Sequence, residues 1–167
     1  MILRLLFTGV FLLDTINGDW KQKINKNGVA VYVRTTANSK IKSVRSVTNI
    51  KSSIVEVKEI ILEVNGYNKW VYKCSKAEVL KKISKKELIY YQVTNAPFPV
   101  KNRDLIANMK VLEKNNEIEI IIKALPKERP NDKSMVRIKI FDSVWRLKKA
   151  GDRVEVTNEI TTDPGGD

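Results

Sequence analysis

The sequence predicts an α+β fold in which a strongly curved antiparallel sheet wraps around one helix. From Trp20 onward, apolar and polar side chains alternate with a period of two, which is typical of strands that bury one face. This alternation is broken once, by the segment SSIVEVKEIILEV, whose apolar residues follow a helical period. Short turns join the later strands, so consecutive strands are expected to pair in antiparallel fashion.

Two strands are expected before the helix. Three valines alternate with Ala30, Tyr32 and Arg34 directly after the turn dipeptide Asn27-Gly28. The segment 42–50 has the same alternation and forms the second predicted strand.

The single predicted helix begins at the pair Ser52-Ser53, either of which can act as the N-cap. Glu56 is placed to complete a capping box. The helix is expected to end at Asn65-Gly66. Its apolar face comprises Ile54, Val57, Ile60, Ile61 and Val64.

The rest of the chain reads as six strands that form a meander. Turn residues at 84–86, 114–116 and 150–152 separate neighbouring strands, and the proline-bearing LPKERPND (125–132) is a longer loop. The expected strands are 75–83, 87–94, 104–113, 117–123, 134–147 and 153–162.

Composition narrows the classes of function. A chain of 167 residues is long enough for one domain with a genuine core, and no central segment can span a bilayer. Histidine is absent and Cys74 is the single cysteine, so we expect no metal site, no cofactor and no catalytic triad. Cys74 fits a buried, inert thiol better than a nucleophile, because no histidine base is present.

The net charge of +12 favours anionic partners such as phospholipid headgroups or nucleic acid. Several lysines cluster on one predicted hairpin, where they either attract an anionic membrane surface or form a solvated face. These lysines are Lys73, Lys76, Lys81, Lys82, Lys85 and Lys86.

The first 18 residues have the pattern of a secretory signal peptide. Arg4 precedes the apolar block Leu5 to Leu13, and small polar residues follow, with possible cleavage after Gly18. A start-site extension or a buried first strand is the alternative. We therefore expect a periplasmic or secreted domain spanning 19–167.

The stretch NAPFPVKNRD (95–104) places two opposite charges at the start of an apolar strand. Pro97 and Pro99 cannot donate ladder hydrogen bonds, so an extended loop precedes the strand. Because side chains alternate, Arg103 shares a face with Leu105 and not with Asp104. An inward arginine needs an acidic partner, a polar ligand or water, unless it reaches solvent from the strand end.

Six segments, in order, carry a resemblance to a known family. They are NGVAVYVR (27–34), NGYNKWV (65–71), AEVLKKI (77–83) with ELIYYQV (87–93), APFPVKNRD (96–104), MVRIKIFDSVWRL (135–147) and DPGG (163–166). From Trp20 to its end, the chain resembles a START domain, the lipid-transfer module related to the steroidogenic acute regulatory protein.

The resemblance implies a helix-grip fold, a curved antiparallel sheet that encloses a cavity for one hydrophobic ligand. It also implies that Arg103 lies in that cavity. In the family a C-terminal helix follows DPGG and closes the cavity, and this chain stops at Asp167, so the helix is expected to be absent. Glu78 is the nearest candidate for the acidic partner of Arg103.

The predicted function is non-enzymatic binding or transfer of a hydrophobic small molecule, expected to be a lipid. An aromatase/cyclase-like enzyme that uses the same cavity and a basic nucleic-acid-binding module are the alternatives, although the aromatics needed for base stacking are directed toward the core. Nucleic acid is not expected as a partner, whereas a homo-oligomer is possible. The predicted ligand-binding residues are Arg103, Glu78, Trp70, Tyr91, Met109 and Trp145.

Overall fold

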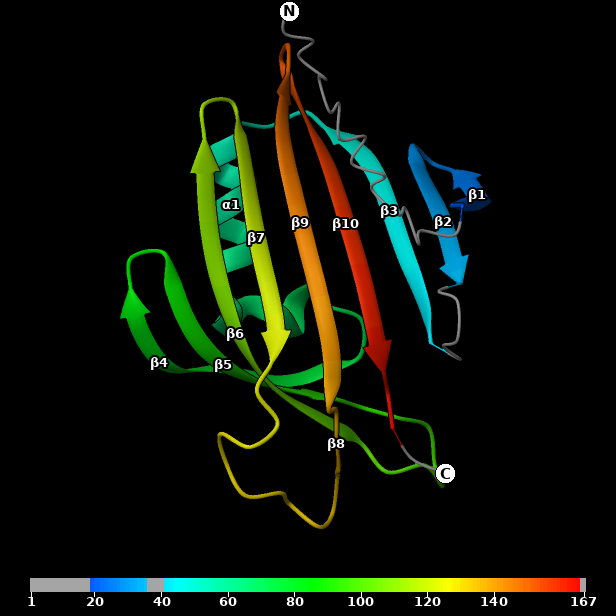
Figure 1. The fold of residues 1–167 in the computed structure, drawn as a ribbon, viewed down its shortest axis with the longest axis vertical. Coiled ribbons are helices and arrows are strands. Elements are labelled where there is room, and N and C mark those ends of the chain that lie inside the picture. Colours follow the sequence, from blue (N-terminus) through cyan, green and yellow to red (C-terminus); the bar gives the residue numbers. More distant parts are fainter. Residues whose placement is uncertain (1–18, 36–40, 166–167) are drawn as a thin grey trace, which may run out of the picture.

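The computed structural model describes residues 19–35 and 41–165, which form a curved sheet with one α-helix against its concave face (Figure 1). The predicted signal peptide lies outside the described residues. The strands are β1 (Lys21–Lys26), β2 (Val29–Thr35), β3 (Lys42–Ile50), β4 (Cys74–Ser84), β5 (Glu87–Thr94), β6 (Arg103–Lys114), β7 (Glu117–Ala124), β8 (Val136–Arg137), β9 (Ile140–Ala150) and β10 (Arg153–Asp163). The helices are α1 (Ile54–Leu62) and the 3-10 helix η1 (Val64–Lys69).

The sheet order is β1-β2-β3-β10-β9-β7-β6-β5-β4. All neighbours on this path pair in antiparallel fashion, which confirms the predicted sheet type. The non-local pair β3–β10 joins the two ends of the sequence at the middle of the sheet (Figure 1). Together with the helix on the concave face, this arrangement is the predicted helix-grip fold.

Two features of the sheet differ from the sequence prediction. Strand β1 was not predicted, and it forms a hairpin with β2 around Asn27-Gly28, whose positive φ angles of 54° and 75° suit the tight turn between twisted strands. The strand predicted at 134–147 is divided, because β8 pairs in parallel with β6 whereas β9 pairs with β7 and β10.

Helix α1 begins at the predicted capping box. Ser53 is the N-cap, since its Oγ accepts a hydrogen bond from the backbone N–H of Glu56 at 3.1 Å. The Glu56 carboxylate accepts one in return from the backbone N–H of Ser53 at 2.9 Å, and this bond is the main cause that lowers the pKa of Glu56. The helix ends at Leu62, earlier than predicted, because the chain tightens into η1.

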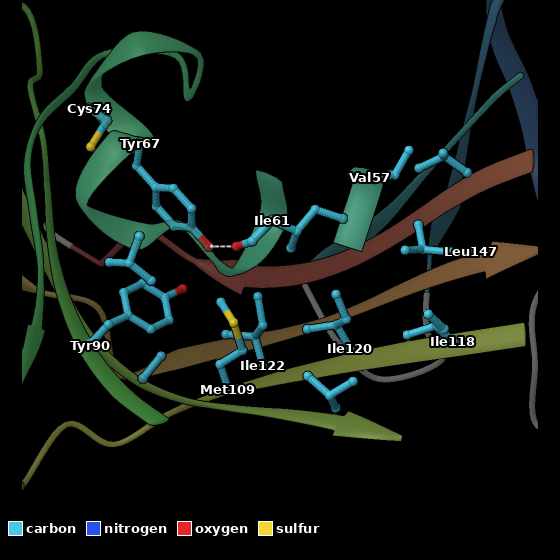
Figure 2. Close-up of a cluster of buried hydrophobic side chains, with 14 of the residues drawn as sticks. Val57, Ile61, Tyr67, Cys74, Tyr90, Met109, Ile118, Ile120, Ile122 and Leu147 are labelled. Atoms are coloured by element: carbon cyan, nitrogen blue, oxygen red, sulfur yellow. Dashed lines mark hydrogen bonds between the residues drawn. The ribbon is translucent and has the colours of Figure 1, made fainter. Parts of the chain in front are cut away.

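The main core lies between this helical segment and the concave face (Figure 2). Tyr67 of η1 donates its phenol proton to the carbonyl of Ile61 at 2.6 Å, so the polar end of a buried ring is satisfied. Burial raises the pKa of Tyr67, which therefore stays neutral and keeps this donor. The fully buried sheet residues include Tyr90, Met109, Ile120 and Leu147.

Helical cover of the concave face stops short of its other end. In the described part of the chain, no helix follows β10, and no helix there is long and apolar enough to cross a bilayer. The segment after β10 turns at Pro164 and Gly165 beside the loop that joins β5 to β6 (Figure 1). The concave face is therefore closed by α1 at one end and open at the other.

Candidate functional site

An apolar pocket of about 370 Å³ lies at the open end of the concave face. Its volume falls within the range of roughly 300–1,000 Å³ that is usual for small-molecule sites. The β5–β6 loop and the ends of β5, β6, β9 and β10 enclose it. Its lining residues are Gln92, Thr94, Asn95, Ala96, Pro97, Val100, Arg103, Leu105, Ile138, Phe141, Thr162 and Pro164.

Arg103 lines this pocket together with Leu105, on the face that strand parity predicts. Its guanidinium donates to three backbone carbonyls: Nη1 to Lys101 at 2.6 Å, Nη2 to Gly165 at 3.0 Å and Nε to Pro164 at 3.3 Å. Among the described residues, no carboxylate lies within ion-pair distance of Arg103. Carbonyl dipoles thus take the place of the expected acidic partner.

The turn that Arg103 holds is fixed locally as well. The Asp163 carboxylate accepts a hydrogen bond from the backbone N–H of Gly165 at 2.9 Å. Gly165 has a φ of +61°, and a Cβ there would lie 3.2 Å from Cγ1 of Val136. Residues 163–165 therefore pack closely against β8 and present the carbonyls of Pro164 and Gly165 to Arg103.

Asp104 points to the opposite face of β6, where it forms a buried ion pair with Arg137 of β8. Nη2 of Arg137 lies 2.7 Å from Oδ2, Nε lies 2.9 Å from Oδ1, and the two side chains are only 3% and 2% exposed. Nη1 of Arg137 also donates to the carbonyls of Pro126 and Arg129, at 2.9 and 3.1 Å. This bidentate pair fastens the 125–132 loop to β6 and β8.

Trp70 and Trp145 stand over the concave face in a chain of edge-to-face aromatic contacts. Trp70 follows η1 and lies with its ring centroid 5.3 Å from that of Tyr67 and 6.4 Å from that of Trp145. Trp145 is four residues beyond Phe141 on β9, so it faces the same side as the pocket. Trp70 remains 44% exposed.

Tyr91 and Glu78 lie on the other face of the sheet, which corrects their expected place in the cavity. They are register partners, and Tyr91 packs with Ile106 in a second cluster away from the concave core. Glu78 pairs with Lys76 at 3.2 Å and with Arg129 at 3.9 Å, rather than with Arg103.

Met109 is on the concave face but not in the open pocket. It is fully buried in the core beneath α1 and also borders a separate groove of about 520 Å³ between the helical segment and the β4–β5 hairpin. Met109 lies six positions along β6 from Arg103, which is about 20 Å. The six predicted site residues therefore do not form one site.

Of the residues that line the pocket, the sequence prediction named only Arg103 as a ligand-binding residue, and three of the others could have been found from strand parity. Phe141 was absent from the predicted site, although its spacing from Trp145 places both on one face. Gln92 and Thr94 lie on the face of β5 opposite to Tyr91. They would have been predicted as pocket residues if the inward face of β5 had been assigned correctly. That face is hidden in the sequence, because β5 buries apolar side chains on both of its faces.

The clusters of titratable side chains bear on metal binding and on thiol reactivity. No group of three or more His, Cys, Asp or Glu side chains that could hold a metal ion occurs in the described residues. Cys74 is buried, its thiol donates to the carbonyl of Lys76 at 3.4 Å, and burial raises its pKa. These properties describe an unreactive thiol.

Comparisons with known proteins identify the family of this chain. The family model described as START domain matches residues 14–166. The chain is 32% identical over 151 residues to an uncharacterized Pseudomonas aeruginosa protein, PA1579, with 89% of this chain and 74% of that protein covered.

Solved structures extend the likeness. The STAR-related lipid transfer protein of Xanthomonas axonopodis has a TM-score of 0.83 and 28% identity, over 88% of this chain and 83% of that one. Human STARD10 shares the fold, with a TM-score of 0.78 and 16% identity, over 88% of this chain and 62% of that one. The chain therefore belongs to the START domain family.

Proposed function

We propose that this protein binds one hydrophobic molecule, of the lipid class, at the open end of its concave face, without catalysing a reaction. The observation that carries the proposal is the apolar pocket lined by Leu105, Ile138 and Phe141, with one arginine at its edge. The chain belongs to the START domain family, and a similar solved structure is that of a STAR-related lipid transfer protein. Both observations support a lipid as the ligand. We further propose that the bound molecule is carried between membranes.

Arg103 orients the polar end of the ligand in this proposal. A guanidinium carries five N–H donors, and three of those of Arg103 are given to carbonyls. The remaining donors are on Nη1 and Nη2, and Arg103 lines a pocket whose other lining is mostly apolar. An anionic or carbonyl group of a lipid would complete the set, while the acyl part lies against Leu105 and Phe141.

The test is native mass spectrometry of the purified protein, followed by extraction and identification of any retained lipid. We expect one hydrophobic molecule per chain. Phe141→Ala should reduce its occupancy, because that ring forms a wall of the pocket. Arg103→Leu should change the classes of lipid retained more than it changes stability.

Arg153→Leu is the matched control, since Arg153 is exposed at the start of β10 and does not line the pocket. Its lipid profile should equal that of the wild type. An unaltered profile in Arg103→Leu would remove the proposed role of Arg103. An empty wild-type protein that also takes up no lipid from vesicles would contradict the proposed function.

Two finer proposals accompany this one. Export rests on the pattern of residues 1–18, and N-terminal sequencing of the protein from its native cell would test it, since an intact Met1 would contradict cleavage. The absence of catalysis is tested by assaying the wild type and Arg103→Leu for cyclase activity, because activity that depends on Arg103 would restore the cyclase alternative, which uses the same cavity.

A further inference from the structure

One wall of the pocket is more polar than the proposed role of Arg103 requires. Gln92 and Thr94 line the pocket two residues apart on β5, so their side chains lie on the same face of the sheet. Strand register places Thr94 directly opposite Arg103 on β6. Gln92 is therefore a diagonal neighbour of Arg103, and the Cβ atoms of such neighbours lie about 7 Å apart, within reach of long side chains. We call Gln92, Thr94 and Arg103 the polar corner of the pocket.

One hydrogen bond orients the amide of Gln92 within the polar corner. Its Nε2 donates to Oγ1 of Thr94 at 3.3 Å. An amide side chain also carries an acceptor oxygen, and among the described residues none donates a hydrogen bond to Oε1 of Gln92. Gln92 is half-buried, so water reaches this oxygen when the pocket holds no ligand.

A bound lipid changes the surroundings of this oxygen. The lining beyond the polar corner is mostly apolar and includes Leu105, Ile138 and Phe141, so an apolar ligand would displace the water without replacing its hydrogen bond. An acceptor that loses its water and gains no donor weakens binding, whereas a ligand that brings an O–H satisfies it. The neighbouring guanidinium of Arg103 has only donors to offer. The polar corner therefore suits one group that both accepts and donates, which is a hydroxyl.

We propose that the polar corner selects an uncharged lipid whose polar end carries a hydroxyl group, such as a long-chain alcohol or a monoacylglycerol. The hydroxyl oxygen accepts a hydrogen bond from a remaining N–H of Arg103, and its proton is donated to Oε1 of Gln92. The inference rests on the proposed function, because it names the class of lipid that the same pocket takes.

An anionic lipid is the competing ligand. Arg103 by itself would hold any acceptor group of a lipid, an anion included, and Gln92 narrows the choice. An ionised carboxylate or phosphate diester has acceptors alone, so it leaves Oε1 of Gln92 without a donor. Three backbone carbonyls already accept from the guanidinium of Arg103, and their dipoles lower the positive potential that it presents to the pocket.

The experiment compares probes that differ in one polar group. Decanol and decyl methyl ether share the same alkyl chain, and only the alcohol donates a hydrogen bond. Decanoate is the anionic probe of the same chain length. Affinities for the delipidated full chain are measured by titration calorimetry and by competition in native mass spectrometry. We expect the alcohol to bind roughly tenfold more tightly than the ether, and decanoate to bind more weakly than the alcohol.

Gln92→Met tests the amide directly. Methionine has a similar length and no amide, so the alcohol should lose roughly tenfold in affinity while the affinity of the ether stays unchanged. Unchanged binding of the ether also shows that the pocket of the variant is intact. Gln22→Met is the matched control, because Gln22 is exposed on β1 and does not line the pocket. Thr94→Val should reduce the advantage of the alcohol, since the amide loses the acceptor that orients it.

The outcomes separate this inference from the proposed function. Equal affinities of the wild type for the alcohol and the ether would overturn the inference alone, because the pocket would still bind an apolar chain. Tighter binding of decanoate that persists in Gln92→Met would also overturn it, since Arg103 would then select an anion without help from Gln92. Binding of none of the three probes, together with no retained lipid, would overturn both the inference and the proposed function.

Discussion

The two ends of the concave face are built from the same strands and differ in what covers them. At the closed end, α1 and η1 lie on the sheet, and Ile120 and Leu147 are fully buried. At the open end, the same face carries Arg103 and the half-buried Phe141 around a pocket. The alternation of apolar residues is similar at both ends, so the helical cover decides which end is core and which is a site.

The comparison also explains how an arginine is tolerated on an apolar face. At the closed end a guanidinium would be buried without partners, which costs several kcal/mol. At the open end, the carbonyls of Lys101, Pro164 and Gly165 accept its hydrogen bonds. A charged side chain is therefore tolerated on this apolar face only where backbone carbonyls of the chain accept its hydrogen bonds.

The largest effect is expected from breaking the ion pair that supports the open end from the opposite face. Asp104→Ala leaves Arg137 buried without its carboxylate, so we expect a loss of about 3–5 kcal/mol in the free energy of unfolding. Urea unfolding measures it. The double variant Asp104→Leu with Arg137→Met removes both charges and should recover much of the loss. A loss below about 1 kcal/mol in the single variant would show that the pair does not fasten the loop.

A smaller but still large effect is expected at the closed end. Ile120→Ala removes a fully buried side chain beneath α1, at a cost of about 2–5 kcal/mol. Ile121→Ala is the matched control, because that neighbour is half-buried and points to the convex face. Thermal or urea unfolding compares the two, and equal costs would contradict the assignment of the core to the helix-covered face.

The smallest effect on the free energy of unfolding is expected from a change to α1, the helix that covers the closed end. Ser53→Ala removes the N-cap of α1, and we expect a loss of about 0.5–2 kcal/mol in unfolding free energy. Ser53→Asp keeps a capping oxygen and should retain most of the stability. If alanine and aspartate behaved alike in urea unfolding, α1 would be held by its packing alone.

Local signals predicted most of the elements. The capping box at Ser53 and Glu56 depends on residues three apart, and the turns at 84–86 and 114–116 depend on adjacent ones. Strand β1 escaped prediction because all of its residues are exposed, so burial left no alternating pattern to detect. The sequence also failed to show which residues of β5 face the concave side, for the opposite reason. Tyr90 and Tyr91 lie on opposite faces of the sheet and both are buried, so neither face can be recognised by its polarity.

By itself, the sequence determined the α+β class, the order of most strands, the helix cap and the face of β6 that carries Arg103. These depend on neighbours a few residues apart, through backbone alternation and capping. Only the tertiary structure decided that Arg103 bonds Pro164 and Gly165, and that Asp104 pairs with Arg137. Those partners are 61, 62 and 33 residues away, and sheet register, which no local pattern encodes, brings them together.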